Sequence, residues 1–332
     1  MLLSPQETAS ALWPEVQELS GILAGTRENM IRQTQNISSG ETRTANGLAL
    51  SPTMASMCVD DFVRTIEFLR GTHAAIVDLR KQIDRRPVRI LYVGCGPHAT
   101  LALPLMTVFS CNEAVFTLLD IHPESIRSAK SNVERLGLVD SVADFETVDA
   151  AAFCIRPDKP PDVILLEVMQ ACLESEPQVA ITRHLLRQAP LAVLVPEEVR
   201  VNLELMDPSR EFLNTGLESN HGPAQRDRIP VAPVFALNRE TVNSWDNSCS
   251  NRITASTICM PGSWGEQYQP MLFTEIRIYK NHVLKDYDSG LTCPRALRLD
   301  ASIAPGATID FVYELGDHPR LVGSTRKCAE AK

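Results

Sequence analysis

Two glycines and an alanine in this 332-residue sequence have the spacing of a nucleotide-binding turn. Gly94-Cys95-Gly96 follows the short apolar run 90–93 and, with Ala99, fits G-x-G-x-x-G/A. Glycines where a strand passes into a helix let the backbone approach a ligand, and the first N–H groups of that helix favour negative charge. The spacing suits NAD, FAD or S-adenosylmethionine, and it also suits a tight turn without a ligand.

Two acidic residues downstream of the glycines could bind the same cofactor. Asp120 ends the apolar run 115–119, at the distance where an acid accepts the ribose hydroxyls of a nucleoside. The alternative is that Asp120 caps a helix beginning near Pro123. Asp149 is a further acidic residue downstream, in the segment VDAAA (148–152). The glycine turn and these acids predict a cofactor site without distinguishing NAD from S-adenosylmethionine.

Three glutamates follow another apolar run and could bind a cation. Glu167 ends the run 163–166, and Glu174 and Glu176 follow it closely. Paired carboxylates match the planar fork of donors of a guanidinium, two bonds at a time. The alternative is a solvated loop in which Ser175 caps the helix entered at Pro177. Glu167 fits that alternative poorly, because a charge at the end of an apolar strand needs a partner.

These residues belong to an alternation of strands and helices. Strands are predicted at 89–93, 115–119, 141–147, 163–166 and 191–195, and helices at 99–109, 122–136 and 178–188. Such alternation predicts a doubly wound parallel sheet, with ligands at the carboxyl ends of its strands. The glycines, aspartates and glutamates all fall at such ends.

The regions on either side of this alternation differ in period. Apolar residues recur at helical spacing before residue 87, first at Trp13, Val16, Leu19 and Leu23 and then over 55–83, with the polar stretch 33–46 between. After Pro196 the period becomes two, in 199–206, 273–279 and 309–315. We therefore predict an N-terminal helical region (1–87), a cofactor-binding sheet (88–196) and an antiparallel β domain (197–332), with 207–229 as a possible dimerisation arm.

Composition narrows the class of protein. A net charge of −9 argues against a nucleic-acid partner and suits a cationic substrate. Nine scattered cysteines without a C-x-x-C pair indicate neither a disulfide framework nor a metal site, and favour a reducing cytoplasm. The first residues lack the basic start of a signal peptide, and no apolar run has membrane-spanning length. We expect a cytoplasmic protein without a membrane partner.

Several of these segments resemble the protein arginine N-methyltransferase family. Glu167 and Glu176 form E-x-M-x(6)-E before an apolar helix, which is similar to the family's double-glutamate hairpin. The segment DFVRTIEF (61–68) is similar to the family's D-x-V-R-T helix, and 185–207 resembles its passage into the β domain. The resemblance covers residues 55–206 and implies a Rossmann-like methyltransferase sheet, an N-terminal region covering the cofactor, and an antiparallel β-barrel-like domain.

The resemblance also implies roles for individual residues. S-adenosyl-L-methionine would be the cofactor and S-adenosyl-L-homocysteine the product. Gly94, Gly96, Asp120 and Asp149 would lie at its nucleoside, and Arg64 would hold its carboxylate. Glu167 and Glu176 would bind the guanidinium as catalytic residues. A surface ion pair of Arg64 with Asp60 or Asp61 is the alternative for that arginine. The family tends to form homodimers, and we expect one here.

The sequence departs from the family pattern in the β domain and before the D-x-V-R-T helix. The T-H-W loop is absent, and residues 262–265 (GSWG) are the nearest candidate. The family's tyrosines are missing too; Arg43 is a candidate to close the site, and His98 to contact the cofactor. These departures favour a free guanidino acceptor such as L-arginine, as in the L-arginine N-methyltransferases of nitrosourea natural-product biosynthesis. A peptide arginine methyltransferase, a non-catalytic cofactor-binding protein and an NAD-dependent oxidoreductase are the alternatives.

Overall fold

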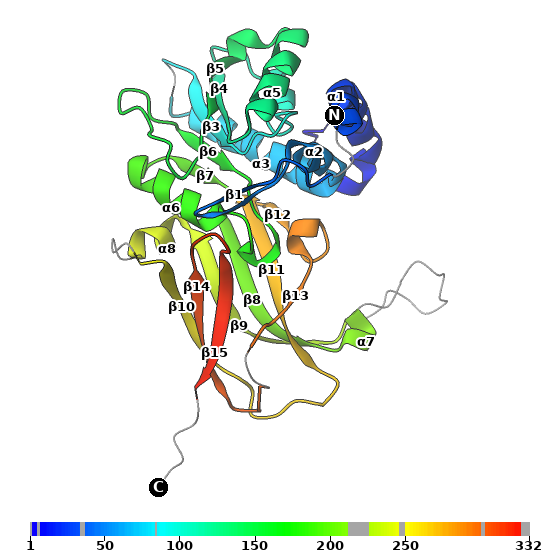
Figure 1. Cartoon of the computed structure of the whole chain (residues 1–332), viewed down its shortest axis with the longest axis vertical. Coiled ribbons are helices and arrows are strands. Elements are labelled where there is room, and N and C mark those ends of the chain that lie inside the picture. Colours follow the sequence, from blue (N-terminus) through cyan, green and yellow to red (C-terminus); the bar gives the residue numbers. More distant parts are fainter. Residues whose placement is uncertain are drawn as a thin grey trace.

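The computed structural model describes residues 2–4, 7–33, 37–83, 85–211, 226–245, 250–299 and 303–326. Figure 1 shows two stacked parts, an α/β part that contains the N-terminal helices and a β part beneath it. Across the described ranges, no helix is both long enough and apolar enough to cross a membrane.

A parallel sheet of five strands, in the order β5-β4-β3-β6-β7, forms the centre of the α/β part. The strands are β3 (Val88–Val93), β4 (Ala114–Asp120), β5 (Val142–Thr147), β6 (Val163–Leu166) and β7 (Val193–Val195). The chain runs outward from β3 to β5 and then crosses to the other side of β3, so the loops after β3 and β6 diverge and leave a crevice at their carboxyl ends. This order confirms the predicted doubly wound, Rossmann-like sheet, with all five strands in place.

The helices of this part agree with the prediction except directly after the glycines. They are α3 (Phe62–Arg80), α4 (Leu103–Met106), α5 (Pro123–Arg135), the 3-10 turn η3 (Val139–Ser141) and α6 (Gln178–Gln188). The helix predicted over 99–109 is wrong, because only the four residues of α4 are helical and turns occupy 97–102. Ala99 has a left-handed φ of 45°, which no regular right-handed helix contains.

The N-terminal region is helical, with a break and a hairpin that the sequence did not predict. Its elements are η1 (Ala9–Leu12), α1 (Trp13–Gln33), β1 (Thr42–Thr44), β2 (Gly47–Ala49), α2 (Pro52–Met57) and η2 (Cys58–Asp60). Asp61 interrupts the helical pattern of 55–83, because its side chain accepts from the N–H of Arg64 and begins α3 there. Trp13 is 51% exposed, so it does not share the buried face of Val16 and Leu23.

The β part consists of two antiparallel sheets. One has the order β12-β11-β8-β9, with β13 also paired to β11, and the other has the order β10-β14-β15. The strands are β8 (Glu198–Met206), β9 (Arg228–Asn238), β10 (Arg252–Cys259), β11 (Gln269–Tyr279), β12 (His282–Leu284), β13 (Arg295–Ala296), β14 (Thr308–Glu314) and β15 (Arg320–Arg326). Among the described residues no strand pair joins the two sheets, so the barrel is not closed by hydrogen bonds. The predicted antiparallel β domain is confirmed.

Four short helical elements lie near the strands of the β part, and the long helix α3 packs against two of these strands. The short elements are η4 (Ala171–Leu173), α7 (Pro208–Glu211), α8 (Arg239–Ser244) and η5 (Gly290–Thr292). The long helix α3 contacts β11 and β12 of the β part as well as β3 and β6 of the sheet. Most of the predicted arm at 207–229 lies outside the described residues, which stop at 211 and resume at 226.

Candidate functional site

A pocket of about 290 Å³ occupies the crevice at the carboxyl ends of β3, β4 and β6. Residues of the parallel sheet, of the β1–β2 hairpin, of α2 and α3, and of the segment 290–295 in the β part line it. Gly94, Gly96, Asp120, Asp149, Arg64, Glu167 and Glu176 all belong to this lining. The structure thus brings these seven residues, which the sequence singled out, into one pocket.

The glycine turn is held between the ends of β3 and β4. Gly94 and Gly96 have φ values of 72° and 62°, which a side chain would strain. A Cβ built at Gly94 would also overlap the Cγ1 atom of Val168, so no larger residue fits between β3 and β6. The N–H of Gly96 donates to Oδ2 of Asp120 at 2.9 Å. The turn is therefore fixed by its own strand ends, before any ligand binds.

Asp120 and Asp149 lie at the end of the pocket formed by this turn. Oδ1 of Asp120 accepts from the N–H of His122 at 2.9 Å. The N-cap position of α5 is occupied by His122 itself, so the alternative role of Asp120 as the helix cap is wrong. Oδ1 of Asp149 accepts from the N–H of Ala151 at 2.9 Å, which orients this second carboxylate at the pocket wall.

The acidic loop, residues 167–177, carries the glutamates and has an unusual backbone. Cys172, Leu173 and Ser175 have φ values of 60°, 58° and 66°, in the left-handed region that favours glycine. Such residues cost free energy and persist only where the surroundings hold them. The three lie within four positions, directly before the buried Glu176.

Contacts from the β part hold the acidic loop in this shape. The N–H of Cys172 donates to Oγ1 of Thr274 on β11 at 2.9 Å. The hydroxyl of Tyr313 on β14 donates to the carbonyl of Leu173 at 2.6 Å. The N–H of Ser175 donates to the carbonyl of Pro319, in the turn between β14 and β15, at 2.8 Å. The loop that carries the glutamates is thus shaped by a part of the chain that begins far downstream.

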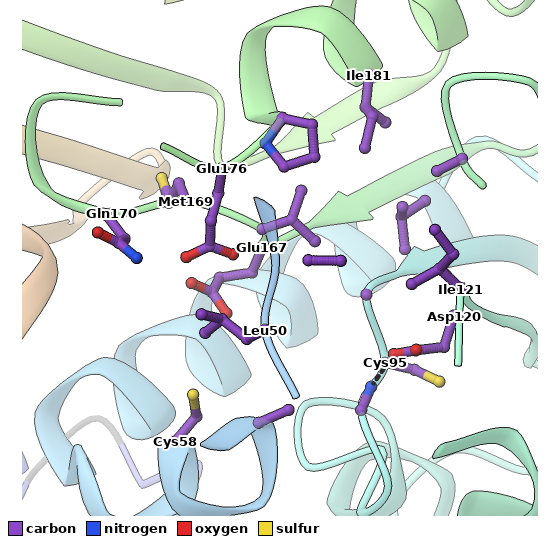
Figure 2. Close-up of a pocket in the computed structure, with 18 of the residues that line it drawn as sticks. Leu50, Cys58, Cys95, Asp120, Ile121, Glu167, Met169, Gln170, Glu176 and Ile181 are labelled. Atoms are coloured by element: carbon purple, nitrogen blue, oxygen red, sulfur yellow. Dashed lines mark hydrogen bonds between the residues drawn. The ribbon is translucent and has the colours of Figure 1, made fainter. Parts of the chain in front are cut away.

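The carboxylates of Glu167 and Glu176 converge in the middle of the pocket, as Figure 2 shows. Glu176 is only 5% exposed, and burial raises its pKa to about 7, against the opposing effects of Arg64 and Gln170. The solvated-loop alternative is therefore wrong for Glu176. Glu174, in contrast, does not line the pocket. Of the two neighbouring glutamates, only Glu176 belongs to the site.

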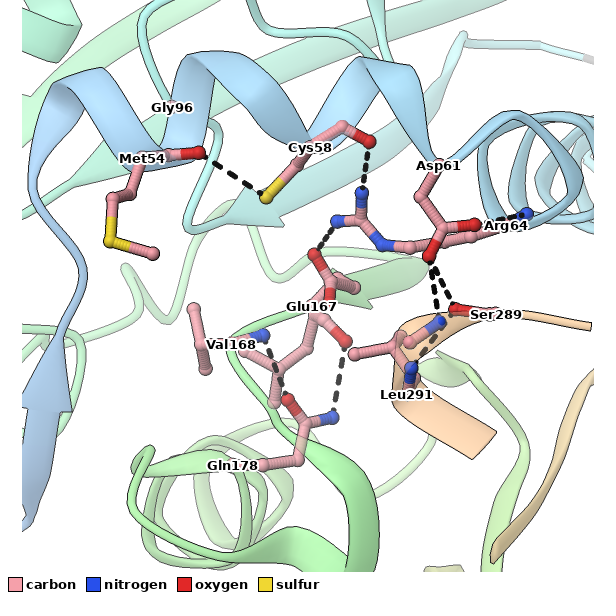
Figure 3. Close-up of polar contacts among 12 residues, drawn as sticks. Met54, Cys58, Asp61, Arg64, Gly96, Glu167, Val168, Gln178, Ser289 and Leu291 are labelled. Atoms are coloured by element: carbon pink, nitrogen blue, oxygen red, sulfur yellow. Dashed lines mark hydrogen bonds and ion pairs between the residues drawn. The ribbon is translucent and has the colours of Figure 1, made fainter. Parts of the chain in front are cut away.

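Arg64 connects the cofactor side of the pocket to Glu167 (Figure 3). Its guanidinium forms an ion pair with Oε2 of Glu167, and its Nη1 donates to the carbonyl of Cys58 at 2.9 Å. The residue is 6% exposed, so the alternative of a surface pair with Asp60 or Asp61 is wrong. Its Nε–H is buried and has no hydrogen-bond partner in the described structure. A buried donor without a partner is costly, and a carboxylate ligand would satisfy it.

Gln178 orients Glu167 from the other side. It is the first residue of α6, and its amide donates from Nε2 to the carbonyl of Leu166 at 3.1 Å and accepts from the N–H of Val168 at 3.0 Å. These two bonds flank Glu167 and fix the backbone where β6 ends. Gln178 was not predicted as a site residue from the sequence, although its place at the start of a helix, 11 positions after a glutamate that ends a strand, is a local signal.

Three further candidates from the sequence do not line the pocket. Trp264 and its neighbours do not line it; the β part reaches the pocket through Gly290, Leu291 and Arg295 instead. Arg43 does not line it either, and its Nη1 donates to the carbonyl of Asp317 at 3.0 Å. His98 is buried outside the lining. The buried Cys95 packs in the core, and burial raises the pKa of its thiol well above the usual range.

The β1–β2 hairpin and η5 complete the pocket and were not predicted. The N–H of Leu48 donates to the carbonyl of Ser175 at 2.8 Å, which places the hairpin against the acidic loop. Figure 1 shows the hairpin between the α/β part and the β part. Oδ2 of Asp61 accepts from the hydroxyl of Ser289 at 2.6 Å and from the N–H of Gly290 at 3.1 Å, so η5 is tied to the start of α3.

The chain matches no protein-family model and no curated protein. Its structure resembles those of methyltransferases. One is protein arginine methyltransferase 10 of Arabidopsis thaliana, with a TM-score of 0.48 and 12% identity over 77% of this chain and 86% of that one. Another is magnesium protoporphyrin IX methyltransferase of Synechocystis, with a TM-score of 0.29 and 17% identity over 47% and 64% of the two chains. The [4+2]-cyclase SpnF also matches, with a TM-score of 0.28 and 18% identity over 55% and 57%. At such identities the likeness concerns the fold alone, so function has to be argued from the site.

Proposed function

We propose that this protein is an S-adenosyl-L-methionine-dependent N-methyltransferase that acts on a guanidino group. The proposal rests on one observation, which is that a single pocket contains both a glycine turn with acidic residues and a pair of glutamates. A glycine turn with two aspartates forms one end, and two converging glutamates with a buried arginine form the centre. An NAD-dependent oxidoreductase would leave this pair of carboxylates unexplained.

The residues at the first end fit the cofactor. Gly94 and Gly96 leave the backbone open at the end of β3, and Asp120 and Asp149 offer carboxylate oxygens to hydroxyl and amino groups. The buried Nε–H of Arg64, which has no partner among the described residues, suits the methionyl carboxylate. When bound, the cofactor supplies an electrophilic methyl group on a sulfonium.

Glu167 and Glu176 would bind the acceptor. Their carboxylates can accept hydrogen bonds from two sides of a guanidinium and hold the third nitrogen toward the cofactor. Holding two reactants in line can contribute about 7–11 kcal/mol to the lowering of a barrier. Methyl transfer would form the N–C bond as the methyl–sulfur bond of the cofactor breaks, leaving S-adenosyl-L-homocysteine, and the acceptor nitrogen would lose a proton. Glu176, whose pKa of about 7 is far above that of an ordinary glutamate, could accept this proton.

Free L-arginine is the acceptor that we favour, with Nω-methyl-L-arginine as product in a natural-product pathway. The pocket supports a small acceptor, because the β1–β2 hairpin and η5 enclose it from two sides. We also propose that the chain is divided into the regions 1–87, 88–196 and 197–332. The proposal includes a cytoplasmic location and a homodimer. An arginine-containing peptide is the alternative acceptor, and a non-catalytic protein that binds the cofactor is the alternative function.

Mass spectrometry of products tests the proposal. The protein is incubated with S-adenosyl-L-methionine and either free L-arginine or an arginine-glycine-rich peptide. Methylated L-arginine is the expected product, and methylated peptide alone would favour the alternative acceptor. Binding of S-adenosyl-L-homocysteine with no product from either would contradict methyl transfer to these guanidines. Glu174→Gln is the matched control for Glu176→Gln, because it removes the same charge from the same loop outside the pocket.

A further inference from the structure

Arg295 brings a second arginine to the pocket, from the β part of the molecule. It is the first residue of β13 and pairs with Leu272 on β11. Two positions further along β11, Thr274 accepts from the N–H of Cys172 in the acidic loop. Arg295 lines the same pocket as Gln170, Ala171 and Glu176 of the acidic loop. Arg295 therefore borders the glutamate side of the pocket.

The surroundings of Arg295 differ from those of Arg64. Arg64 is buried and forms an ion pair with Glu167, whereas Arg295 is exposed and its side chain makes no hydrogen bond or ion pair with any described residue. Most exposed arginines of the β part have an acidic partner; Arg326, for example, bonds to Asp310. Arg295 thus lines the pocket with all five of its donors available to a ligand.

The pocket consequently has a fixed order of charges. Figure 2 shows Asp120 at one side, the converging Glu167 and Glu176 in the middle, and Gln170 on the side nearer the tan ribbon of the β part. The glycine turn lies on the Asp120 side, because the N–H of Gly96 donates to Asp120. A molecule whose cationic end meets the two glutamates would direct its other end toward the β part, where Arg295 lies. An anionic group at that end of the molecule would be attracted to the positive charge of Arg295.

We propose that Arg295 binds the carboxylate of the acceptor and makes the site selective for a free guanidino acid over a guanidine without a carboxylate. This inference rests on the proposed function, because it takes the glutamates as the site of the guanidinium. A guanidinium and a carboxylate form two parallel hydrogen bonds, which fixes orientation as well as affinity. In a peptide the main-chain carboxylate of an internal arginine is an amide, so Arg295 would have no partner there.

The experiment compares two acceptors that differ only in the carboxylate. L-arginine and agmatine, which is L-arginine without its carboxylate, are each titrated into the protein saturated with S-adenosyl-L-homocysteine, by calorimetry, and their KM values are measured in methyl transfer. The variants are Arg295→Ala, Arg295→Lys and, as matched control, Arg298→Ala. Arg298 is an exposed arginine three residues away that does not line the pocket.

We expect Arg295→Ala to raise the ratio of Kd for L-arginine to Kd for agmatine by about 10-fold or more, as for a charge-assisted contact. Arg295→Lys should restore part of the selectivity, since it keeps the charge without the fork. Arg298→Ala should leave the ratio unchanged, and added salt should weaken L-arginine binding, because Arg295 is exposed.

Two results would overturn the inference. One is an unchanged ratio in Arg295→Ala, whether both affinities fall equally or neither changes, and the other is a loss of S-adenosyl-L-homocysteine affinity in place of L-arginine affinity. The last result would assign Arg295 to the cofactor. Failure of the proposed function would look different from failure of this inference. Binding of L-arginine that depends on Arg295, without methyl transfer, would contradict the activity and support the inference. Methyl transfer that does not depend on Arg295 would support the activity and contradict the inference.

Discussion

The two ends of the pocket differ in how their polar groups are satisfied. At the glycine turn, the carboxylate of Asp120 accepts from the N–H groups of Gly96 and His122. At the acceptor end, Glu176 is buried with a raised pKa, and Arg295 has no partner in the described part of the chain. At the turn, the hydrogen bonds are already formed before a ligand binds. At the other end, a cationic acceptor would compensate the buried carboxylate of Glu176, and its own carboxylate would compensate the charge of Arg295. Under the proposed function, this difference assigns the selectivity to the acceptor end.

Removing a glutamate should give the largest effect and should be confined to the acceptor end. We expect Glu167→Gln and Glu176→Gln each to lower kcat/KM for the guanidine by a factor of about 10² or more, because one carboxylate then faces the guanidinium alone. The affinity for S-adenosyl-L-homocysteine should change far less in Glu176→Gln. Steady-state kinetics and calorimetry measure the two quantities.

The matched variant Glu174→Gln should retain the wild-type kcat/KM, since Glu174 does not line the pocket. Full turnover in both Glu167→Gln and Glu176→Gln would show that the glutamates do not bind the acceptor, and the comparison between the two ends would lose its basis.

A side chain at the glycine turn should act on the cofactor end. Gly94→Ala adds a Cβ at a φ of 72° and overlaps Val168, so we expect about 2–4 kcal/mol of lost stability together with weakened cofactor binding. Gly137→Ala is the matched control, because Gly137 has a φ of 70° but nothing within 4 Å of its Cβ position. Chemical denaturation of both variants separates the effect of the overlap with Val168 from the effect of the backbone strain. Equal losses of unfolding free energy in the two variants would show that the overlap contributes nothing.

The pKa of Glu176 should make the acceptor end pH-dependent. A bound guanidinium needs the ionised carboxylate, so kcat/KM should rise with pH and level off above about 7. Glu176→Gln should lack this rise. A profile in Glu176→Gln that follows the wild type would assign the ionisation to another group.

The same raised pKa has a consequence for folding. Because the pKa of Glu176 in the folded protein lies above the 4.5 of an ordinary glutamate, the stabilising contribution of protonated Glu176 is present below about pH 4.5 and is lost as the pH rises to about 7. At about 1.4 kcal/mol per pKa unit the loss is about 3 kcal/mol. Glu176→Gln should therefore gain stability relative to the wild type between pH 4.5 and 7, as measured by urea denaturation at both pH values.

The smallest effect should come from a contact that holds the acidic loop. Tyr313→Phe removes the hydrogen bond to the carbonyl of Leu173 and should cost about 1 kcal/mol of stability. It should raise KM for the acceptor while KM for the cofactor stays near the wild-type value. Tyr279→Phe, which removes a hydroxyl that bonds to Asp78 away from the pocket, is the control. Equal changes in both KM values would mean that the two ends are not independent.

Much of the cofactor end could be predicted from the sequence, because its signals are local. The runs that became β3, β4 and β6 are short and apolar, and the chemically useful residue follows each run directly. A parallel sheet aligns the carboxyl ends of its strands, so Gly94, Asp120 and Glu167 had to meet at one edge. The short α4 was not predictable in the same way, since the apolar pattern of 99–109 is equally consistent with turns packed in the core.

The sequence by itself determined the doubly wound sheet, the antiparallel β domain and the strand ends where polar residues gather, because strand periodicity and glycine conformation act over a few residues. Only the tertiary structure decided the burial of Glu176, the pairing of Arg64 with Glu167 across 103 positions, and the arrival of Arg295 at the pocket. Burial and charge pairing depend on which distant segments cover a residue. The acidic loop takes its shape from Thr274, Tyr313 and Pro319, and no local pattern near Glu176 encodes them.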